Sequence, residues 1–263
     1  MPRILCLHGK GTSGAIFKSQ TSALRARLSD LQIDFEFVDG FYSSDPAPGI
    51  DLFYPPPYYS FWEQDNIEAV FHSRDWLVNY LRTNGPYDAL MMFSQGCAVG
   101  SSTALLHLLE EPNQPLPFKA AIFICAGVPL RVLEKVGYKI APEVWDKDIV
   151  TRKALAAQAD SSAILSQGSM RWQGEKGISA SEADIRKEIA PSNVQIDIPT
   201  VHIYGDKDPR WSAGIQLSQA CNATKRRMYN HGGGHEVPRT NEVTTGMAEL
   251  VRWALREAAV IDE

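Results

Sequence analysis

The stretch that decides the fold is ALMMFSQGCAVGSSTALL, residues 89–106. Its first five residues form an apolar run typical of a buried strand, and the residues after Gly96 have the small and aliphatic composition of a helix. Ser94 stands at the junction. A serine on a sharp strand-to-helix turn exposes its hydroxyl, and the helix N-terminus beside it favours negative charge. The stretch therefore predicts an α/β fold with Ser94 as a nucleophile.

Composition and charge narrow the class of protein. The 263 residues include 22% charged and 44% hydrophobic side chains, as in an ordinary globular protein. A net charge of −5 gives no basic footprint for nucleic acid, and no apolar run reaches the roughly 18 residues of a membrane span. The N-terminus enters a strand-like segment without a signal-peptide pattern. Four scattered cysteines show no metal-binding spacing and suggest free thiols in a cytoplasmic protein.

Strand-like and helix-like segments alternate along the chain. The expected strands are residues 3–7, 34–38, 89–93, 120–125, 200–204 and 226–229. Residues 67–81 and 247–258 carry apolar side chains at helical spacing. This alternation predicts one α/β domain over residues 1–263, with a doubly wound, mostly parallel sheet and helices on both faces.

Two stretches interrupt the alternation. Residues 41–62 are dense in proline and aromatic residues, and such a long loop either lines a pocket or packs its own rings on the surface. We expect Tyr58, Tyr59 and Trp62 from this loop, together with Trp211, to bind substrate. Residues 129–191 form a longer insertion with helical pieces near 150–165 and 181–189, and they are expected to be a lid over the strand ends.

The first glycine-rich turn has two interpretations. Gly9, Gly11 and Gly14 match the dinucleotide fingerprint, and Asp39 follows at about the distance of a ribose-binding acid. The same turn could instead supply half of an oxyanion hole, in which the backbone N–H of Lys10 or Gly11 acts together with that of Gln95. His8 before the glycines favours the second interpretation.

The last third of the chain offers an acid and a base. Residues 205–209, GDKDP, end the fifth expected strand, and the spacing selects Asp208 over Asp206 as the carboxylate that orients a histidine. Three glycines precede His235 and let a short loop carry its imidazole over the strand ends. His231 is the alternative base. The order Ser94, Asp208, His235 is that of the α/β-hydrolases.

Together these segments resemble the FSH serine hydrolases, small α/β-hydrolases common in fungi. The resemblance covers nearly the whole chain and rests on residues 5–9, 12–14, 17–20, 93–96, 205–209 and 231–238. It implies a Ser94–Asp208–His235 triad and esterase or thioesterase chemistry, and some fungal members release polyketide chains from a synthase's carrier domain. Met92 departs from the family pattern, which has glycine at that place in G-x-S-x-G.

The sequence therefore predicts a serine hydrolase that cleaves an ester or thioester of an apolar acyl group through an acyl-enzyme, without metal or organic cofactor. An acyl-carrier domain is a further expected partner. Two other functions stay open at this point. Met92 motivates a catalytically impaired hydrolase fold that serves as a binding module, and the glycine-rich turn motivates a dinucleotide-dependent oxidoreductase.

Overall fold

A computed structural model describes residues 1–64, 66–158, 165 and 181–262. The strands are β1 (Arg3–Leu7), β2 (Asp34–Val38), β3 (Tyr42–Ser43), β4 (Tyr59–Ser60), β5 (Ala89–Phe93), β6 (Ala120–Ile124), β7 (Lys139–Ile140), β8 (Ile189–Ala190), β9 (Thr200–Tyr204) and β10 (Arg226–Asn230). The helices are α1 (Gly14–Gln20), α2 (Ser22–Ala26), the 3-10 turn η1 (Ser29–Leu31), α3 (Ile67–Asn84), α4 (Gln95–Glu110), α5 (Leu130–Lys135), α6 (Pro142–Gln158), α8 (Glu182–Lys187), α9 (Trp211–Gln219) and α10 (Asn241–Glu257).

Six strands form the central sheet in the order β10-β9-β6-β5-β1-β2, and every neighbouring pair is parallel. This confirms the predicted doubly wound α/β fold, and each of the six expected strands matches an observed strand to within one residue. Two short antiparallel ribbons, β3–β4 and β7–β8, lie outside this sheet. Because β5 lies inside the sheet, the turn that follows it is flanked by strands on both sides.

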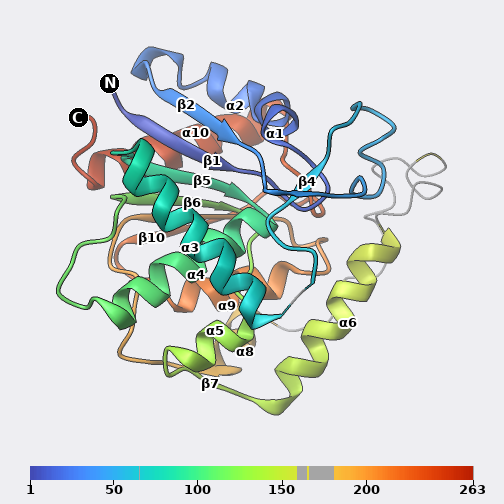
Figure 1. Ribbon diagram of the computed structural model, residues 1–263, viewed down its shortest axis with the longest axis vertical. Coiled ribbons are helices and arrows are strands. Elements are labelled where there is room, and N and C mark those ends of the chain that lie inside the picture. Colours follow the sequence, from blue (N-terminus) through green and yellow to red (C-terminus); the bar gives the residue numbers. More distant parts are fainter. Residues whose placement is uncertain (65, 159–164, 166–180, 263) are drawn as a thin grey trace.

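The sheet is buried on both faces, as parallel sheets are. Along β5, Leu90 and Met92 pack into one apolar cluster, whereas Met91 and Phe93 pack into another. The cluster containing Met92 includes side chains of α3, α4, α5 and α9, and the opposite cluster includes side chains of α1, α2 and α10. The helices thus cover both faces of the sheet (Figure 1).

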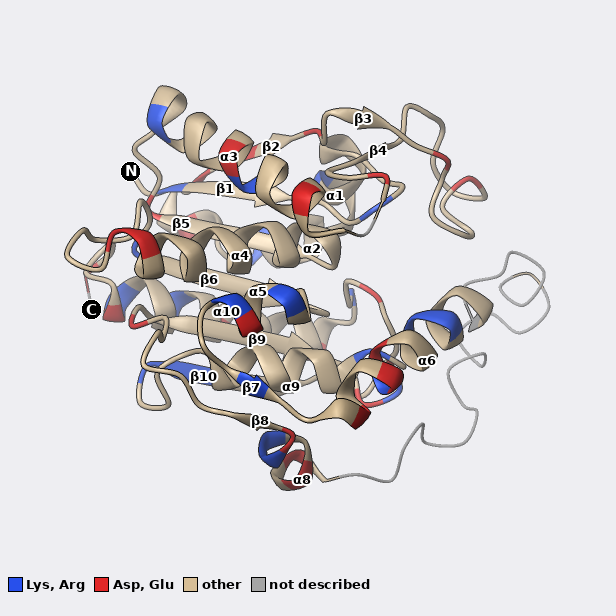
Figure 2. Ribbon diagram, turned by 60° about the horizontal axis from the view of Figure 1, so that its bottom comes forward, with Lys and Arg blue, Asp and Glu red and all other residues tan. Residues whose placement is uncertain are grey.

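Parts of the two segments that interrupt the alternation, the β3–β4 ribbon and α6, extend past the carboxyl end of the strands (Figure 2). The β3–β4 ribbon lies beyond one side of this end and α6 beyond the other (Figure 2). The expected helical pieces at 150–165 and 181–189 overlap α6 and α8, and residues 159–164 and 166–180 fall outside the described residues. Within the described ranges, no helix has the length and apolar character needed to cross a membrane.

Candidate active site

Ser94 lies on a strained turn between β5 and α4. Its backbone has φ 51° and ψ −111°, a conformation that side-chain-bearing residues rarely adopt. Two hydrogen bonds fix the turn from its neighbours: the Ser94 N–H donates to the Ile124 carbonyl at 3.1 Å, and the Gly96 N–H donates to the His8 carbonyl at 3.1 Å. A Cβ on residue 96 would lie 2.4 Å from the Leu7 carbonyl oxygen, so only glycine fits where α4 crosses β1. The elbow predicted around Ser94 is present.

Ser94, His235 and Asp208 are joined by hydrogen bonds. The Ser94 Oγ lies 2.9 Å from His235 Nε2, and His235 Nδ1 lies 2.7 Å from Asp208 Oδ2. The second carboxylate oxygen of Asp208 accepts the Arg210 backbone N–H at 2.8 Å. Because a carboxylate only accepts, Nδ1 carries the proton and Nε2 is free to accept the Ser94 hydroxyl proton.

The two alternatives that the sequence left for the acid and the base are hydrogen-bonded to groups outside the Ser94–His235–Asp208 chain. The Asp206 N–H is hydrogen-bonded to the Asn230 side chain at 3.2 Å, on the exposed side of the turn. His231 lines the same cavity as His235, but its Nδ1 accepts the Gly233 N–H at 3.2 Å. Burial lowers the pKa of His231 to about 4, so its ring is neutral near neutral pH.

The expected oxyanion donors differ in what they already bind. The Gly11 N–H donates to the Tyr59 carbonyl at 2.9 Å and is therefore not available to a substrate. Among the residues that the structure describes, no acceptor takes the N–H of Lys10 or of Gln95, which is the first residue of α4. The Gln95 side chain is held by the backbone of Phe61, which donates to its Oε1 at 2.9 Å. Of the expected donors, Gly11 is excluded, and Lys10 and Gln95 remain.

The first loop is fixed by a buried histidine. The His8 Nε2 accepts the Gly40 N–H at 2.8 Å, which leaves the Nδ1 proton to point at the Gly9 carbonyl at 2.7 Å. Asp39, the candidate ribose-binding acid, accepts the Gly14 N–H at 2.7 Å. This carboxylate therefore stabilises the first turn of α1, a role that counts against the dinucleotide interpretation.

Met92 is accommodated by a glycine on the next helix. Met92 is fully buried, and its Sδ lies 2.1 Å from the point that a Cβ on Gly100 would occupy. The missing side chain on α4 thus makes room for the thioether that the family pattern lacks. The elbow keeps its geometry because the extra volume at position 92 is offset by the absent volume at position 100.

A cavity of about 1750 Å³ opens above Ser94 and His235. Its walls come from the turn after β1, residues 43–50, 53 and 54, the start of α10 and the last turns of α6, including Leu155. Several apolar side chains line it: Ile50, Phe53, Trp62, Phe93, Val128 and Val243. The cavity can therefore receive an apolar group next to the Ser94 hydroxyl.

Of the four residues expected to bind substrate, only Trp62 lies on this cavity. Tyr58 is buried and its hydroxyl donates to the Tyr54 carbonyl at 2.7 Å. Tyr59 contributes its backbone to the first loop, and its side chain is not among the lining groups. Proline-rich loops fix their own path, and the direction of each ring follows from that path rather than from composition.

Trp211, the fourth residue expected to bind substrate, also lies away from this cavity. It begins α9, and its ring stacks on that of Tyr204 with centroids 6.3 Å apart, away from the cavity. The helix dictates this direction, because it packs residue 211 against the end of β9.

Two residues that the sequence did not indicate as part of the site, Arg210 and Cys125, belong to its surroundings. The Arg210 guanidinium lines the cavity and binds Asp148 of α6 at 2.6 Å, and burial lowers its pKa. Cys125 follows β6 with φ 48° and also lines the cavity. Arg210 comes directly after the acidic turn 205–209, and Cys125 is the last residue of the expected strand 120–125.

Comparisons with known proteins agree with this geometry. Residues 1–247 match the family described as "Serine hydrolase (FSH1)". The chain is 30% identical to Esterase FPY3 of Fusarium mangiferae, with 98% of this chain and 99% of the relative covered. It is 28% identical to Esterase alnB of Emericella nidulans, with 98% of each covered, and 27% identical to Hydrolase FUB4 of Fusarium oxysporum f. sp. lycopersici, with 95% and 97% covered.

Solved structures show the same fold at low sequence identity. A carboxylesterase from Mesorhizobium loti aligns with a TM-score of 0.53 and 10% identity, covering 95% of this chain and 88% of that one. Arabidopsis thaliana SOBER1 aligns with a TM-score of 0.50 and 14% identity, covering 97% and 99%. The family match over residues 1–247 confirms the resemblance drawn from the sequence: the chain belongs to the FSH1 family of serine hydrolases.

Proposed function

We propose that the protein hydrolyses a carboxylic ester or thioester of an apolar acyl group, with Ser94 as nucleophile, His235 as general base and Asp208 as its orienting acid. The observation that carries this proposal is the continuous hydrogen-bonded chain from Ser94 Oγ through His235 to Asp208, at 2.9 and 2.7 Å. We also propose that residues 1–263 act as one catalytic domain, with 129–191 as its lid.

The reaction proceeds in two halves. His235 Nε2 takes the Ser94 proton as Oγ attacks the carbonyl carbon, and Asp208 stabilises the imidazolium that results. The N–H groups of Lys10 and Gln95 hold the negative oxygen, each lowering the barrier by roughly 3–4 kcal/mol as measured for comparable donors. His235 then returns the proton to the leaving group, and water activated by the same nitrogen cleaves the acyl-enzyme.

The surroundings support an apolar acyl group. The groups that line the cavity beside Ser94 include Trp62, Phe93 and Val243, and Leu155 of α6 closes another wall. A thiolate leaves with little help from an acid, so the same residues serve an oxygen ester and a thioester. Release of an acyl chain from a carrier domain is the narrower form of this proposal, and it comes from the family resemblance.

A fluorophosphonate probe tests the proposal directly. Intact mass and peptide mapping are expected to give one adduct, on Ser94, and none in Ser94→Ala. Asp208→Asn is expected to lower ester turnover by about 10⁴-fold, by analogy with the same change in a serine protease, while circular dichroism shows an unchanged fold. An unlabelled Ser94 in folded protein would refute the mechanism and favour the binding-module function.

Substrate class is decided by paired substrates. We expect matched oxygen esters and N-acetylcysteamine thioesters of increasing chain length to show kcat/KM rising with length, because each added methylene enters an apolar cavity. Equal rates for acetyl and long-chain substrates would contradict the apolar acyl group. The ratio of thioester to ester rates then tells whether the carrier-domain form of the proposal holds.

A further inference from the structure

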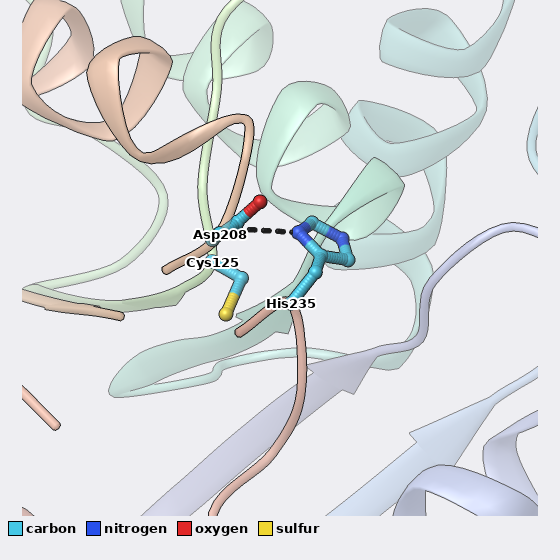
Figure 3. A group of neighbouring side chains, drawn as sticks. All are labelled: Cys125, Asp208 and His235. Carbon is cyan, nitrogen blue, oxygen red and sulfur yellow. Dashed lines mark hydrogen bonds and ion pairs between the residues drawn. The ribbon is translucent and has the colours of Figure 1, made fainter. Parts of the chain in front are cut away.

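Three side chains capable of binding a metal converge beside the proposed nucleophile. One ligand atom each from Cys125, Asp208 and His235 lies within 4.8 Å of the other two. They come from the end of β6, the acidic turn after β9 and the loop after β10, and Figure 3 shows the three side chains together. Among the residues that the structure describes, this is the one group of three or more His, Cys, Asp or Glu side chains so arranged.

The donor set matches one kind of ion. Thiolate sulfur, imidazole nitrogen and carboxylate oxygen are the ligands of Zn²⁺, which prefers four donors in a tetrahedron. Zinc bond lengths of roughly 2.0–2.3 Å put neighbouring ligand atoms about 3.5 Å apart, inside the 4.8 Å limit observed. Side-chain shifts of about an ångström are therefore sufficient, and a water molecule from the cavity can complete the tetrahedron.

The Cys125 thiol is held by the loop that carries His235. Its Sγ lies 3.4 Å from the Glu236 carbonyl and 3.8 Å from the Gly234 carbonyl, the two groups that flank His235 along the chain, and 4.0 Å from His231 Nε2. The thiol is free of disulfide and almost completely buried, yet both Cys125 and His235 line the cavity. An ion entering the cavity can therefore reach both residues.

We propose that Cys125, Asp208 and His235 form an inhibitory site for Zn²⁺, a site that would regulate the proposed esterase by disabling its base. Bound to His235 Nδ1, the ion takes the position of the proton now shared with Asp208. That proton moves to Nε2, the thiol proton leaves to solvent, and one proton is released for each ion bound. With Nε2 protonated, Ser94 has no acceptor for its hydroxyl proton.

The first test measures binding without catalysis. Cd²⁺ replaces Zn²⁺ at such sites and gives an ultraviolet charge-transfer band when bound to a thiolate. We expect this band to saturate at one ion per chain in wild type and in Ser94→Ala, and to disappear in Cys125→Ser. Cys221→Ser, which removes another buried free thiol, serves as the matched control and keeps the band.

The second test measures inhibition. Zn²⁺ is expected to inhibit nitrophenyl ester hydrolysis reversibly, with activity restored by a chelator, and Cys125→Ser raises the half-inhibitory concentration by at least about tenfold, as the loss of one of three ligands should. Each variant is compared with its own metal-free rate. If Cys125→Ser does not fold, Cys125→Gly replaces it, because φ 48° suits glycine.

The outcomes separate this inference from the proposed function. A band that is absent in wild type, or that persists in Cys125→Ser, overturns the metal site. Inhibition that is as strong in Cys125→Ser as in wild type overturns it as well, because the ion then acts elsewhere. A band that behaves as expected in a protein without esterase activity leaves the metal site standing and removes the catalytic proposal.

Discussion

The contact between Met92 and Gly100 predicts that Gly100→Ala destabilises the protein when Met92 is present and stabilises it when Met92 is replaced by alanine. In Gly100→Ala the new Cβ would lie 2.1 Å from the Met92 Sδ and 3.4 Å from Leu90 Cδ1. Met92 is fully buried, so its thioether can make room only by displacing the side chains packed around it. Overpacking of this kind costs about 1–3 kcal/mol, whereas replacing a glycine inside a helix gains about 1 kcal/mol. We expect a net loss of about 1 kcal/mol in the free energy of unfolding.

The same substitution stabilises the protein once the thioether is gone. Met92→Ala alone leaves a void and costs about 2–5 kcal/mol. In the Met92→Ala protein, the new methyl group at position 100 enters the void. Because alanine also has a higher helix propensity than glycine, Gly100→Ala then stabilises the protein by about 1 kcal/mol. The coupling energy of the double-mutant cycle is then about 2 kcal/mol, within the range found for residues in contact.

Urea denaturation of the wild type, the two single variants and the double variant measures this cycle, provided that the unfolding free energy depends on urea concentration with the same slope in all four proteins. Gly214→Ala on α9 is the matched control, because its Cβ would approach nothing closer than the Ala126 carbonyl at 3.3 Å, and it should not couple to Met92. Equal effects of Gly100→Ala in the presence and absence of Met92 would refute the reasoning. The labelling rate of Ser94 by a fluorophosphonate should fall in Gly100→Ala and recover in the double variant.

Three further predictions follow from particular contacts. Asp148→Ala leaves the largely buried Arg210 guanidinium without its carboxylate, and since Arg210 still faces the cavity, it should lower the unfolding free energy by about 2–3 kcal/mol in urea denaturation, less than for a fully buried pair. Gly96→Ala forces α4 away from the Leu7 carbonyl, and it should abolish fluorophosphonate labelling even if circular dichroism shows a folded chain. Burial lowers the pKa of His202 from 6.5 to about 3, so the folded state disfavours its protonation. The unfolding free energy should therefore be unaffected by His202 above pH 6.5. Below that pH the unfolded chain binds a proton that the folded chain does not, so the unfolding free energy falls by about 1.4 kcal/mol per pH unit until the pH approaches 3.

These three predictions have direct controls. For the first, Glu134→Ala breaks an exposed ion pair with Arg131 and should change stability by less than about 1 kcal/mol. A comparable loss in both variants would contradict the importance of burial. Rapid labelling of Gly96→Ala would show that the turn tolerates a side chain. The unfolding free energy of His202→Gln should fall less steeply with acid than that of wild type, and parallel pH profiles would exclude His202 as the cause.

Much of the fold and of the proposed site is local in the sequence. The strands are continuous apolar runs, so their positions followed from composition and turn residues. Ser94, Asp208 and His235 each stand at the carboxyl end of a strand, and parallel strands bring such ends together. The polar chain that joins them was therefore predictable without coordinates.

The remainder depends on contacts between distant segments. The Gly11 N–H donates to the Tyr59 carbonyl, 48 positions away, and no local sequence pattern predicts that hydrogen bond. Met92 is tolerated because Gly100, in the second turn of α4, leaves room for its side chain. This contact forms only when the strand and the helix pack together. The ring directions of Tyr58 and Trp211 likewise follow from the backbone path, which composition does not specify.

The strained backbone at Ser94 affects which substitutions at this position evolution would favour. At φ 51° and ψ −111°, a side-chain-bearing residue carries strain of roughly 1–3 kcal/mol, most of which a glycine would relieve even after its greater loss of entropy on folding. Glycine at position 94 would thus relieve the turn but would remove the proposed nucleophile. Under the proposed mechanism, selection for hydrolysis has to keep serine at this position at a cost in stability, and a gene copy released from that selection would gain stability by the substitution that ends catalysis.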